Sequence, residues 1–232
     1  MFRKNIKKSS AFKMNKTNMV DPCLNNNCSE FEVNHWIIDD FILEKLIPIV
    51  GVRPFPLCEL SLLVSSVAGL KPTQIFEWGT NIGKSARIFY ETCEQFKICS
   101  DIHSIDLPDD VSHNEHPQKQ RGKLVWDIKT VNLHQGDGVN ISLDIYKNNP
   151  TKRPLFFLDG DHSYESVLRE LNQIINNISS PIILIHDTFY QSSESNYNIG
   201  PYKACMEIVD KYPKMFNVRS TMNGLPGLTL LF

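Results

Sequence analysis

Short apolar segments alternate with longer amphipathic ones through most of this chain, and the alternation limits the possible folds more than any other feature. The segments 155–159 (LFFLD) and 182–186 (IILIH) are almost wholly apolar, and a helical pattern fills the sequence between them. Strands that are apolar on both faces and are joined by helices form mainly parallel, doubly wound sheets. The sequence therefore predicts an α/β fold with a mainly parallel, seven-stranded sheet and an N-terminal helical addition.

The same periodicity places the individual elements. The expected strands are residues 75–78, 102–106, 131–135, 155–159 and 182–186, with two last strands near 216–220 and 228–232. The expected helices are residues 34–50, 57–70, 86–96, 119–129, 141–148, 164–178 and 202–212. In such sheets ligands bind beyond the carboxyl ends of the strands. Polar residues at those ends are therefore the candidates for function.

The N-terminal segment differs in composition from the rest. Its first 20 residues include six basic residues and no acidic one, which is typical of a flexible, solvated arm. A docking arm for an anionic surface and a targeting peptide are the alternatives. We expect three parts: a flexible basic arm at 1–30, N-terminal helices at 31–70 and a cofactor-binding catalytic domain at 71–232. Because the chain beyond the arm is acidic, no nucleic-acid partner is expected.

Two further features concern where the chain works. It has no run of about 18 apolar residues, so no membrane span is expected. The six cysteines are scattered and a chain of this size needs no covalent staples, so free thiols and a reducing, cytoplasmic location are predicted. Cys23, Cys28 and His35 have a spacing that a zinc site could use, but no fourth ligand is in view.

The turn EWGTNIGKS, from Glu77 to Ser85, connects an expected strand to an expected helix. Its two glycines lack the Cβ that would hold a ligand away from the backbone, and the first amides of a helix have no intrahelical partner. The pattern departs from the dinucleotide pattern Gly-x-Gly-x-x-Gly, and such a pair can also serve only a tight connection. The candidate cofactor-binding residues are Glu77, Gly79, Thr80, Asn81, Gly83 and Ser85.

Two aspartates follow the next strands. Asp106 ends the second strand, where a carboxylate can accept both hydroxyls of a ribose; a turn or helix cap is its alternative role. Asp137, in HQGDG, is predicted to lie beside an adenine, and a plain turn aspartate is the alternative.

A denser polar cluster joins LDGDHSYE with IHDTF. Asp159 and Asp187 are expected to leave adjacent strands at one edge, where two carboxylates repel unless a cation or proton lies between them. Oxygen ligands with one imidazole suit Mg²⁺ or another divalent cation. Alternatively, Asp159 and Asp161 cap the following helix and His162 is a surface residue. With an ordinary pKa near 6.5, the His162 ring suits a general base, and we expect it to be the catalytic residue.

In these motifs the chain, from about Leu57 to Phe232, resembles the class I S-adenosylmethionine-dependent methyltransferases, and most closely the cation-dependent macrocin O-methyltransferase and cephalosporin hydroxylase-like group. The resemblance implies a Rossmann-like methyltransferase fold and S-adenosylmethionine as cofactor. The implied roles are contacts to the cofactor by Glu77, Gly79, Asp106, Asp137 and Asp159, metal binding by Asp159, His186 and Asp187, and proton removal by His162. The family often has an acidic residue in place of His186. The third ligand is therefore this imidazole, which favours a softer ion than Mg²⁺, or water, or Asp161.

The function that follows is divalent-cation-dependent O-methylation of a hydroxyl on a sugar, glycan or small natural product. Residues 107–122 are expected to form a lid, with His113, His116 and either Phe55 or Tyr190 against the acceptor; an ordinary surface insertion is the alternative. The N-terminal helices could support a homo-oligomer. Three other functions are open, one of them a binding protein on the same scaffold that retains the cofactor and lacks turnover. A nicotinamide-dependent dehydrogenase would need the tighter glycine triplet, and a metal-dependent phosphoesterase would leave the glycine turn without a role.

Overall fold

The computed structural model describes residues 35–111, 120–151, 153–190, 192, 194, 197–221 and 224–232, and by its internal contacts residues 33–232 make up one compact unit. The predicted arm at 1–30, Cys23 and Cys28, and His113 and His116 lie outside the described residues, as does the side chain of His35. None of the helices in the described part combines the length and apolar character that crossing a bilayer requires.

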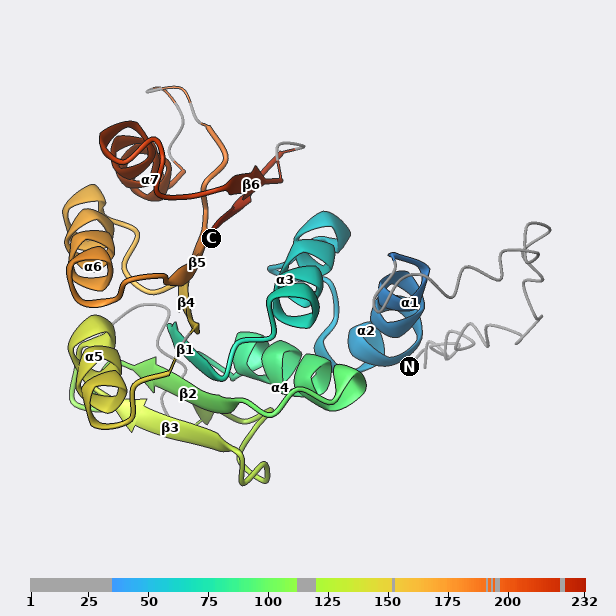
Figure 1. Ribbon diagram of the computed structural model, residues 1–232. Helices are drawn as coiled ribbons and strands as arrows, with labels where there is room; N and C mark the ends of the chain where they lie inside the picture. Colours follow the sequence, from blue (N-terminus) through green and yellow to red (C-terminus); the bar gives the residue numbers. More distant parts are fainter. Residues whose placement is uncertain are drawn as a thin grey trace, which may run out of the picture. The chain divides into compact units, whose positions relative to one another are not determined.

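One seven-stranded sheet organises the unit, in the order β3-β2-β1-β4-β5-β7-β6. Its first five strands run parallel, and β7 pairs antiparallel with both β5 and β6 (Figure 1). The strands are β1 Gln74–Trp78, β2 Asp101–Asp106, β3 Val131–Gln135, β4 Pro154–Leu158, β5 Ile182–His186, β6 Val218–Ser220 and β7 Leu228–Leu231. The predicted mainly parallel seven-stranded sheet is confirmed.

Helices cover both faces of this sheet (Figure 1). They are α1 His35–Asp40, the π-helical η1 Phe41–Leu46, α2 Ile47–Val50, α3 Leu57–Leu70, α4 Lys84–Phe96, α5 Gly138–Asn148, α6 Tyr164–Asn177 and α7 Gly200–Lys211. The N-terminal helices and α4 pack on one face, and α5, α6 and α7 pack on the other.

Two apolar clusters form the core because successive residues of a strand point to opposite faces. Ile75 and Phe157 join the cluster on the side of α3 and α4, whereas Phe76 and Phe156 join the cluster beneath α5, α6 and α7. All residues of β1, β4 and β5 are buried. Any polar side chain in these strands is therefore buried and needs a partner from a neighbouring element.

The structure corrects two of the expected helices. Residues 120–127, within the predicted helix 119–129, form a series of turns, and Gly122 has a φ of +70°. The Gly122 amide donates to the carbonyl of Asn81, so this segment follows the glycine turn as a backbone partner. The predicted helix 34–50 contains a π-helical stretch that ends just before Pro48, which has no N–H to continue the ladder.

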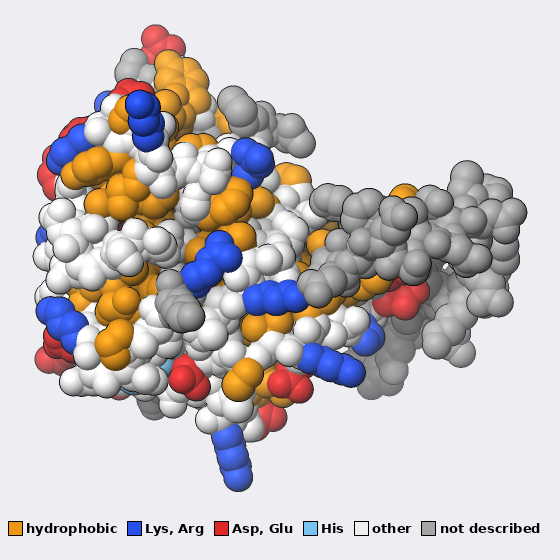
Figure 2. Space-filling view, viewed as in Figure 1, with side chains coloured by type: hydrophobic (Ala, Val, Ile, Leu, Met, Phe, Trp, Pro, Cys, Tyr) orange, Lys and Arg blue, Asp and Glu red, His pale blue; other side chains and the backbone are white. Residues whose placement is uncertain are grey.

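The exposed surface of the N-terminal helices is partly apolar. Trp36, Leu43 and Leu57 are each more than half exposed. On the face drawn in Figure 2, the Lys and Arg side chains are scattered among apolar and uncharged ones.

Gly79 brings the ends of β1 and β4 together. It follows β1 directly, its φ is +94°, and a Cβ at this position would lie 2.0 Å from the carbonyl oxygen of Asp159. No side chain fits in that space. Gly79 therefore makes the tight connection that the sequence analysis gave as one possible role for the glycines of this turn.

Gly79→Ala is expected to destabilise the protein by clearly more than the ~1–2 kcal/mol that a left-handed φ costs other residues. The added methyl also collides with the Asp159 backbone. Gly69→Ala, in α3, is the matched control, because its Cβ meets nothing within 4 Å and alanine is favoured in helices by up to about 1 kcal/mol. Denaturation midpoints check both variants. Wild-type stability of Gly79→Ala would show that the two strand ends are free to separate.

Candidate active site

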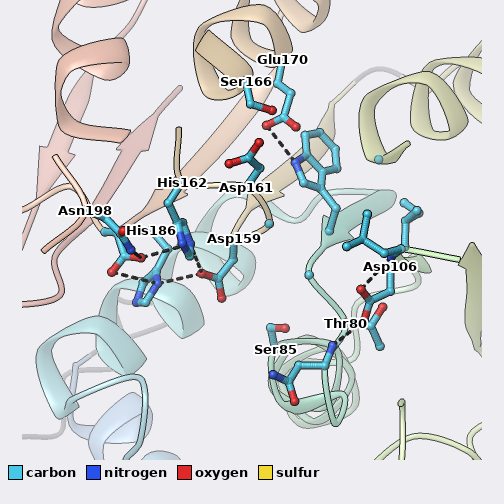
Figure 3. A pocket seen from close by; sticks show the side chains of 18 of the residues that line it. Thr80, Ser85, Asp106, Asp159, Asp161, His162, Ser166, Glu170, His186 and Asn198 are labelled. Carbon is cyan, nitrogen blue, oxygen red and sulfur yellow. Dashed lines mark hydrogen bonds and ion pairs between the residues drawn. The ribbon is translucent and has the colours of Figure 1, made fainter. Parts of the chain in front are cut away.

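A cleft of about 1280 Å³ lies at the carboxyl edge of β1, β2, β4 and β5. Pockets for a single small molecule have volumes of roughly 300–1,000 Å³, so this cleft is larger than one such ligand requires. Seven predicted cofactor residues line it: Gly79, Thr80, Asn81, Ser85, Asp106, Asp137 and Asp159. The predicted general base, His162, and the predicted metal ligands also line it; the ligands are Asp159, His186 and Asp187. Figure 3 shows the histidine and aspartate cluster on one side and Asp106 with Thr80 on the other.

Asp106 is fixed by the backbone of the glycine turn. Its Oδ2 accepts the N–H of Asn81 at 2.9 Å and its Oδ1 accepts the N–H of Leu107 at 2.7 Å. Each carboxylate oxygen can accept more than one hydrogen bond, so capacity remains for a hydroxyl pair in the cleft. The local turn role and the predicted ligand role of Asp106 are thus compatible.

Glu77 occupies a different place from the one expected. The side chain is fully buried and does not line the cleft. Its carboxyl group accepts the hydroxyls of Ser85 and Ser104, and Ser104 also meets Thr80 Oγ1 at 2.6 Å. The residue therefore ties the glycine turn to β2 from below. Gly83 does not line the cleft either; with a φ of +85° it packs against Gly122 and Val125.

Burial raises the pKa of Glu77 to about 8. The hydrogen bonds from Ser104 and Ser85 lower this pKa, and the charges of Asp159 and Asp106 raise it further. At neutral pH the group is therefore mainly uncharged. A carboxyl group that is buried with hydroxyl partners, as Glu77 is, is more stable in its neutral form.

Asp137 is both a helix cap and a cleft residue. Its Oδ1 accepts the N–H of Asn140 at 2.9 Å at the start of α5, and its Oδ2 meets Arg169 at 2.9 Å. This cap explains why α5 begins at Gly138, three residues before the predicted start. Gly138 itself lies against Trp78, where a Cβ would come within 2.5 Å of the indole.

A chain of polar contacts runs from Glu59 in α3 through His186 to Asp159. His186 is buried, and its Nδ1 lies 2.8 Å from Asp159 Oδ1 while its Nε2 lies 3.1 Å from Glu59 Oε2. The other oxygen of Glu59 accepts the N–H of Gly227 at 2.7 Å. Phe55 packs edge-on against the imidazole with ring centroids 5.0 Å apart. The ring is therefore held from three directions.

Asp187 is held on the opposite side of the same cluster. It has a φ of +57°, in the left-handed region that aspartate tolerates better than most residues. Tyr197 donates its hydroxyl to Oδ1 at 2.5 Å, and Asn198 donates to Oδ2 at 3.3 Å. His162 Nε2 lies 3.1 Å from the same Oδ2 and 3.6 Å from Asp159 Oδ1.

The electrostatics of this cluster follow from its burial. Burial alone would raise the pKa of Asp159, but the charge of His186 and hydrogen bonds from His162 and His186 lower it to about 2. Burial alone would lower the pKa of both imidazoles. The charge of Asp159 and the hydrogen bond to it outweigh burial for His186, whose pKa is raised well above the usual value; the same carboxylate and Asp187 raise the pKa of His162. The carboxylates therefore attract positive charge into the site.

The donor set of the cluster fits a divalent cation. Asp159, His186 and Asp187 each offer one ligand atom, and these three atoms lie within 4.8 Å of one another. Two carboxylate oxygens with one imidazole nitrogen are ligands for Mn²⁺ and other hard or borderline ions. Positive charge is what the two aspartates require.

Several residues in the cleft or buried behind it were missed from the sequence. Tyr197 and Asn198 belong to an irregular stretch after β5, where periodicity carries no signal. Glu59 gave one signal: it is an acidic residue on the apolar face of α3, in line with Leu63. Glu170 is also buried and accepts the indole N–H of Trp78 at 3.1 Å. Phe55 lines the cleft as expected, whereas Tyr190 is largely exposed and does not.

A model of the Rhamnosyl O-methyltransferase/CmcI family matches residues 58–230. Among solved structures, CalS11, described as a TDP-rhamnose 3'-O-methyltransferase of calicheamicin biosynthesis, is similar, with 14% identity, 83% of this chain and 86% of that chain covered, and a TM-score of 0.55. The O-methyltransferase of Bacillus cereus has 13% identity, coverage of 86% and 91%, and a TM-score of 0.55. TomG of Streptomyces achromogenes has 11% identity, coverage of 86% and 90%, and a TM-score of 0.55. No curated protein matches.

The sheet order is that of the Rossmann-like methyltransferase fold, and the family match makes the chain a class I S-adenosylmethionine-dependent methyltransferase. Because the family model spans most of the sequence, the particular group is also clear. The chain belongs to the Rhamnosyl O-methyltransferase/CmcI family and is an S-adenosylmethionine-dependent O-methyltransferase. The resemblance stated from the motifs is confirmed.

The raised pKa of Glu77 predicts a specific dependence of stability on pH. The folded protein binds this proton more tightly than the unfolded chain, so the associated stability is fully present below about pH 4.5 and is lost as the pH rises through about 8. Glu77→Gln stays neutral and should lose less stability between pH 5.5 and pH 8.5 than the wild type. Thermal melting at both values measures this. Glu94→Gln, at an exposed position, should follow the wild type, and parallel curves for Glu77→Gln would contradict the assignment.

Proposed function

We propose that this cleft transfers the methyl group of S-adenosylmethionine to a sugar hydroxyl, with Asp159, His186 and Asp187 holding a divalent cation. One observation carries the proposal: the glycine turn with Asp106 and the aspartate and histidine cluster line the same cleft. The Gly79 contact with Asp159 fixes the two sides relative to each other. A donor and an acceptor in one cleft gain most of their rate from this alignment.

The cofactor side is formed by Gly79, Thr80, Asn81 and Asp106. Asp106, already oriented by two backbone amides, would accept the ribose hydroxyls. Asp137 would lie at the adenine end, with its carboxylate held by Arg169. Ser85 would act through its hydrogen bond to Glu77, which supports the turn without touching the cofactor.

His162 is the proposed general base. Its Nε2 is buried and lies 3.1 Å from Asp187 Oδ2 and 3.6 Å from Asp159 Oδ1. A base must be neutral to accept a proton, and the two carboxylates favour the charged ring. A divalent cation held by Asp159 and Asp187 would offset their negative charge and lower that preference. The neutral His162 ring would then accept the proton of the acceptor hydroxyl. When bound, a divalent cation would stabilise the negative charge that develops on the acceptor oxygen.

The acceptor class rests on the family and on the lining of the cleft. The family name refers to O-methylation of a rhamnosyl group, and CalS11 is described as a TDP-rhamnose 3'-O-methyltransferase. Asp161, Tyr197 and Asn198 give this side of the cleft hydrogen-bonding groups that suit a polyhydroxylated ligand. A cytoplasmic location and a homo-oligomer formed through the N-terminal helices stay predictions. The dehydrogenase and phosphoesterase alternatives lose support because the family membership accounts for both motifs.

The function is tested with S-adenosylmethionine labelled in its methyl group. We expect transfer of the label to a rhamnosyl acceptor such as TDP-rhamnose, stimulated by Mg²⁺ or Mn²⁺ and abolished by chelation. S-adenosylhomocysteine should raise the melting temperature, because a ligand that binds only the folded state stabilises it, and NAD⁺ should not. Stabilisation by NAD⁺ alone would overturn the methyltransferase assignment for the cleft, and full activity after chelation would overturn the cation.

Two substitutions separate the proposed roles. His162→Ala should reduce turnover by roughly 10²–10⁴-fold, the usual contribution of a general base, while affinity for S-adenosylhomocysteine changes little. Asp106→Asn should do the reverse and weaken that affinity by about 10- to 100-fold, since a hydrogen bond to a charged group contributes about 1.5–3 kcal/mol. Calorimetry and initial rates on both variants check this. Normal turnover in His162→Ala would exclude the ring as the base.

A further inference from the structure

We propose that Glu59 is a positioning residue that selects the tautomer of His186, so that Nδ1 of the ring, and not Nε2, coordinates the cation. The inference rests on the proposed cation site and adds a residue to it from α3, a helix outside the cofactor-binding sheet. Glu59 would touch neither cofactor nor acceptor.

The first support is the burial of Glu59. Its side chain is only 1% exposed, yet it carries a carboxyl group into the apolar core beneath the site. Both oxygens have partners: Oε1 accepts the N–H of Gly227 at 2.7 Å, and Oε2 lies 3.1 Å from His186 Nε2. A carboxylate can only accept hydrogen bonds. The His186 nitrogen that faces it must therefore carry a proton.

The second support is the direction of the other ring nitrogen. Nδ1 of His186 lies 2.8 Å from Asp159 Oδ1 and 3.7 Å from Asp187 Oδ1, so it faces the two aspartates of the candidate cation site. Phe55 and Phe157 pack against the ring with centroids 5.0 and 6.4 Å away, which limits its rotation. With the proton fixed at Nε2, the lone pair of the neutral ring is at Nδ1. A histidine that ligates a metal typically donates its other N–H to a carboxylate in this way.

The arrangement also compensates for the neutral imidazole that His186 offers beside two carboxylate ligands. A carboxylate at 186 would contribute a negative charge to the cation directly. Here the negative charge is that of Glu59, which acts on the cation indirectly, through its hydrogen bond with the His186 imidazole. Because imidazole binds borderline ions better than it binds Mg²⁺, the site should prefer Mn²⁺ or Co²⁺ to Mg²⁺.

Mn²⁺ binding to the full chain tests the role without reference to turnover. The electron paramagnetic resonance signal of free Mn²⁺ reports affinity, and electron spin-echo modulation reports ¹⁴N coordination. We expect wild-type protein to bind Mn²⁺ with a ¹⁴N signal. Glu59→Gln should bind about 10- to 100-fold more weakly, as is usual when such a partner is lost. Its amide oxygen can accept from Gly227 only by turning its NH₂ toward Nε2, which favours the wrong tautomer.

Two further variants distinguish positioning from folding. Glu170→Gln removes another buried carboxylate from the same cleft, away from the cluster, and should leave Mn²⁺ affinity unchanged. His186→Glu should bind weakly, because its carboxylate faces Glu59. The double variant His186→Glu with Glu59→Gln should regain affinity, lose the ¹⁴N signal and shift preference toward Mg²⁺.

Each outcome has one meaning. If the wild type binds no Mn²⁺, the proposed cation site fails and the role of Glu59 fails with it. If the wild type binds Mn²⁺ with a ¹⁴N signal and folded Glu59→Gln binds equally well, only the role of Glu59 is overturned. Mn²⁺ binding without a ¹⁴N signal in the wild type would remove His186 from the ligand set and overturn the tautomer argument. Recovery in the double variant supports it.

Discussion

The contact between the backbones of Gly79 and Asp159 is the constraint on which the rest of the site depends. The first residue after β1 and the first after β4 lie so close that a single Cβ would overlap a carbonyl oxygen. This close approach places the glycine turn, which is suited to binding a cofactor, next to Asp159 and the aspartate and histidine cluster. The glycine therefore matters first as a spacer between two strands, and only through that spacing as a neighbour of the cofactor.

Buried charge is the second organising factor. Asp159, Asp187 and Glu59 all lie in or under the cleft, and two imidazoles are interleaved with them. Isolated buried carboxylates are costly, so each of these groups depends on its neighbours to remain where it is. Glu77, in contrast, solves the same problem by remaining neutral, because burial raises its pKa to about 8. The cluster of aspartates and histidines is thus charged, whereas Glu77 beneath the glycine turn is neutral.

The N-terminal helices are part of this electrostatic arrangement. They share one apolar cluster with α4 and the sheet, and α3 delivers Glu59 while the following elements deliver His186 and Gly227. Glu59, on a helix that precedes the first strand, can therefore hold His186 at the carboxyl end of β5. Variation at position 186 and variation in α3 are therefore expected to be coupled in this family.

The sequence alone determined where most strands and helices lie along the chain, because burial on both faces leaves a clear apolar pattern in β4 and β5. It also determined that Asp106, Asp159, His162 and Asp187 end strands or follow them closely, and parallel connections place such ends at one edge. The sequence could not show that residues 120–127 form turns. Their pairing with Asn81 and Ile82 is a tertiary contact that overrides helical propensity.

Only the tertiary structure decided which side chains face the cleft. Glu77 and Asp106 are both acidic residues near a strand end, yet one is sealed beneath the turn and the other opens to the ligand side. The pairing of Glu59 with His186 spans more than half of the chain, and Tyr197 reaches Asp187 from an irregular segment. Local periodicity reports the face on which a residue lies. The partner it meets there depends on how distant elements pack, and that information exists only in three dimensions.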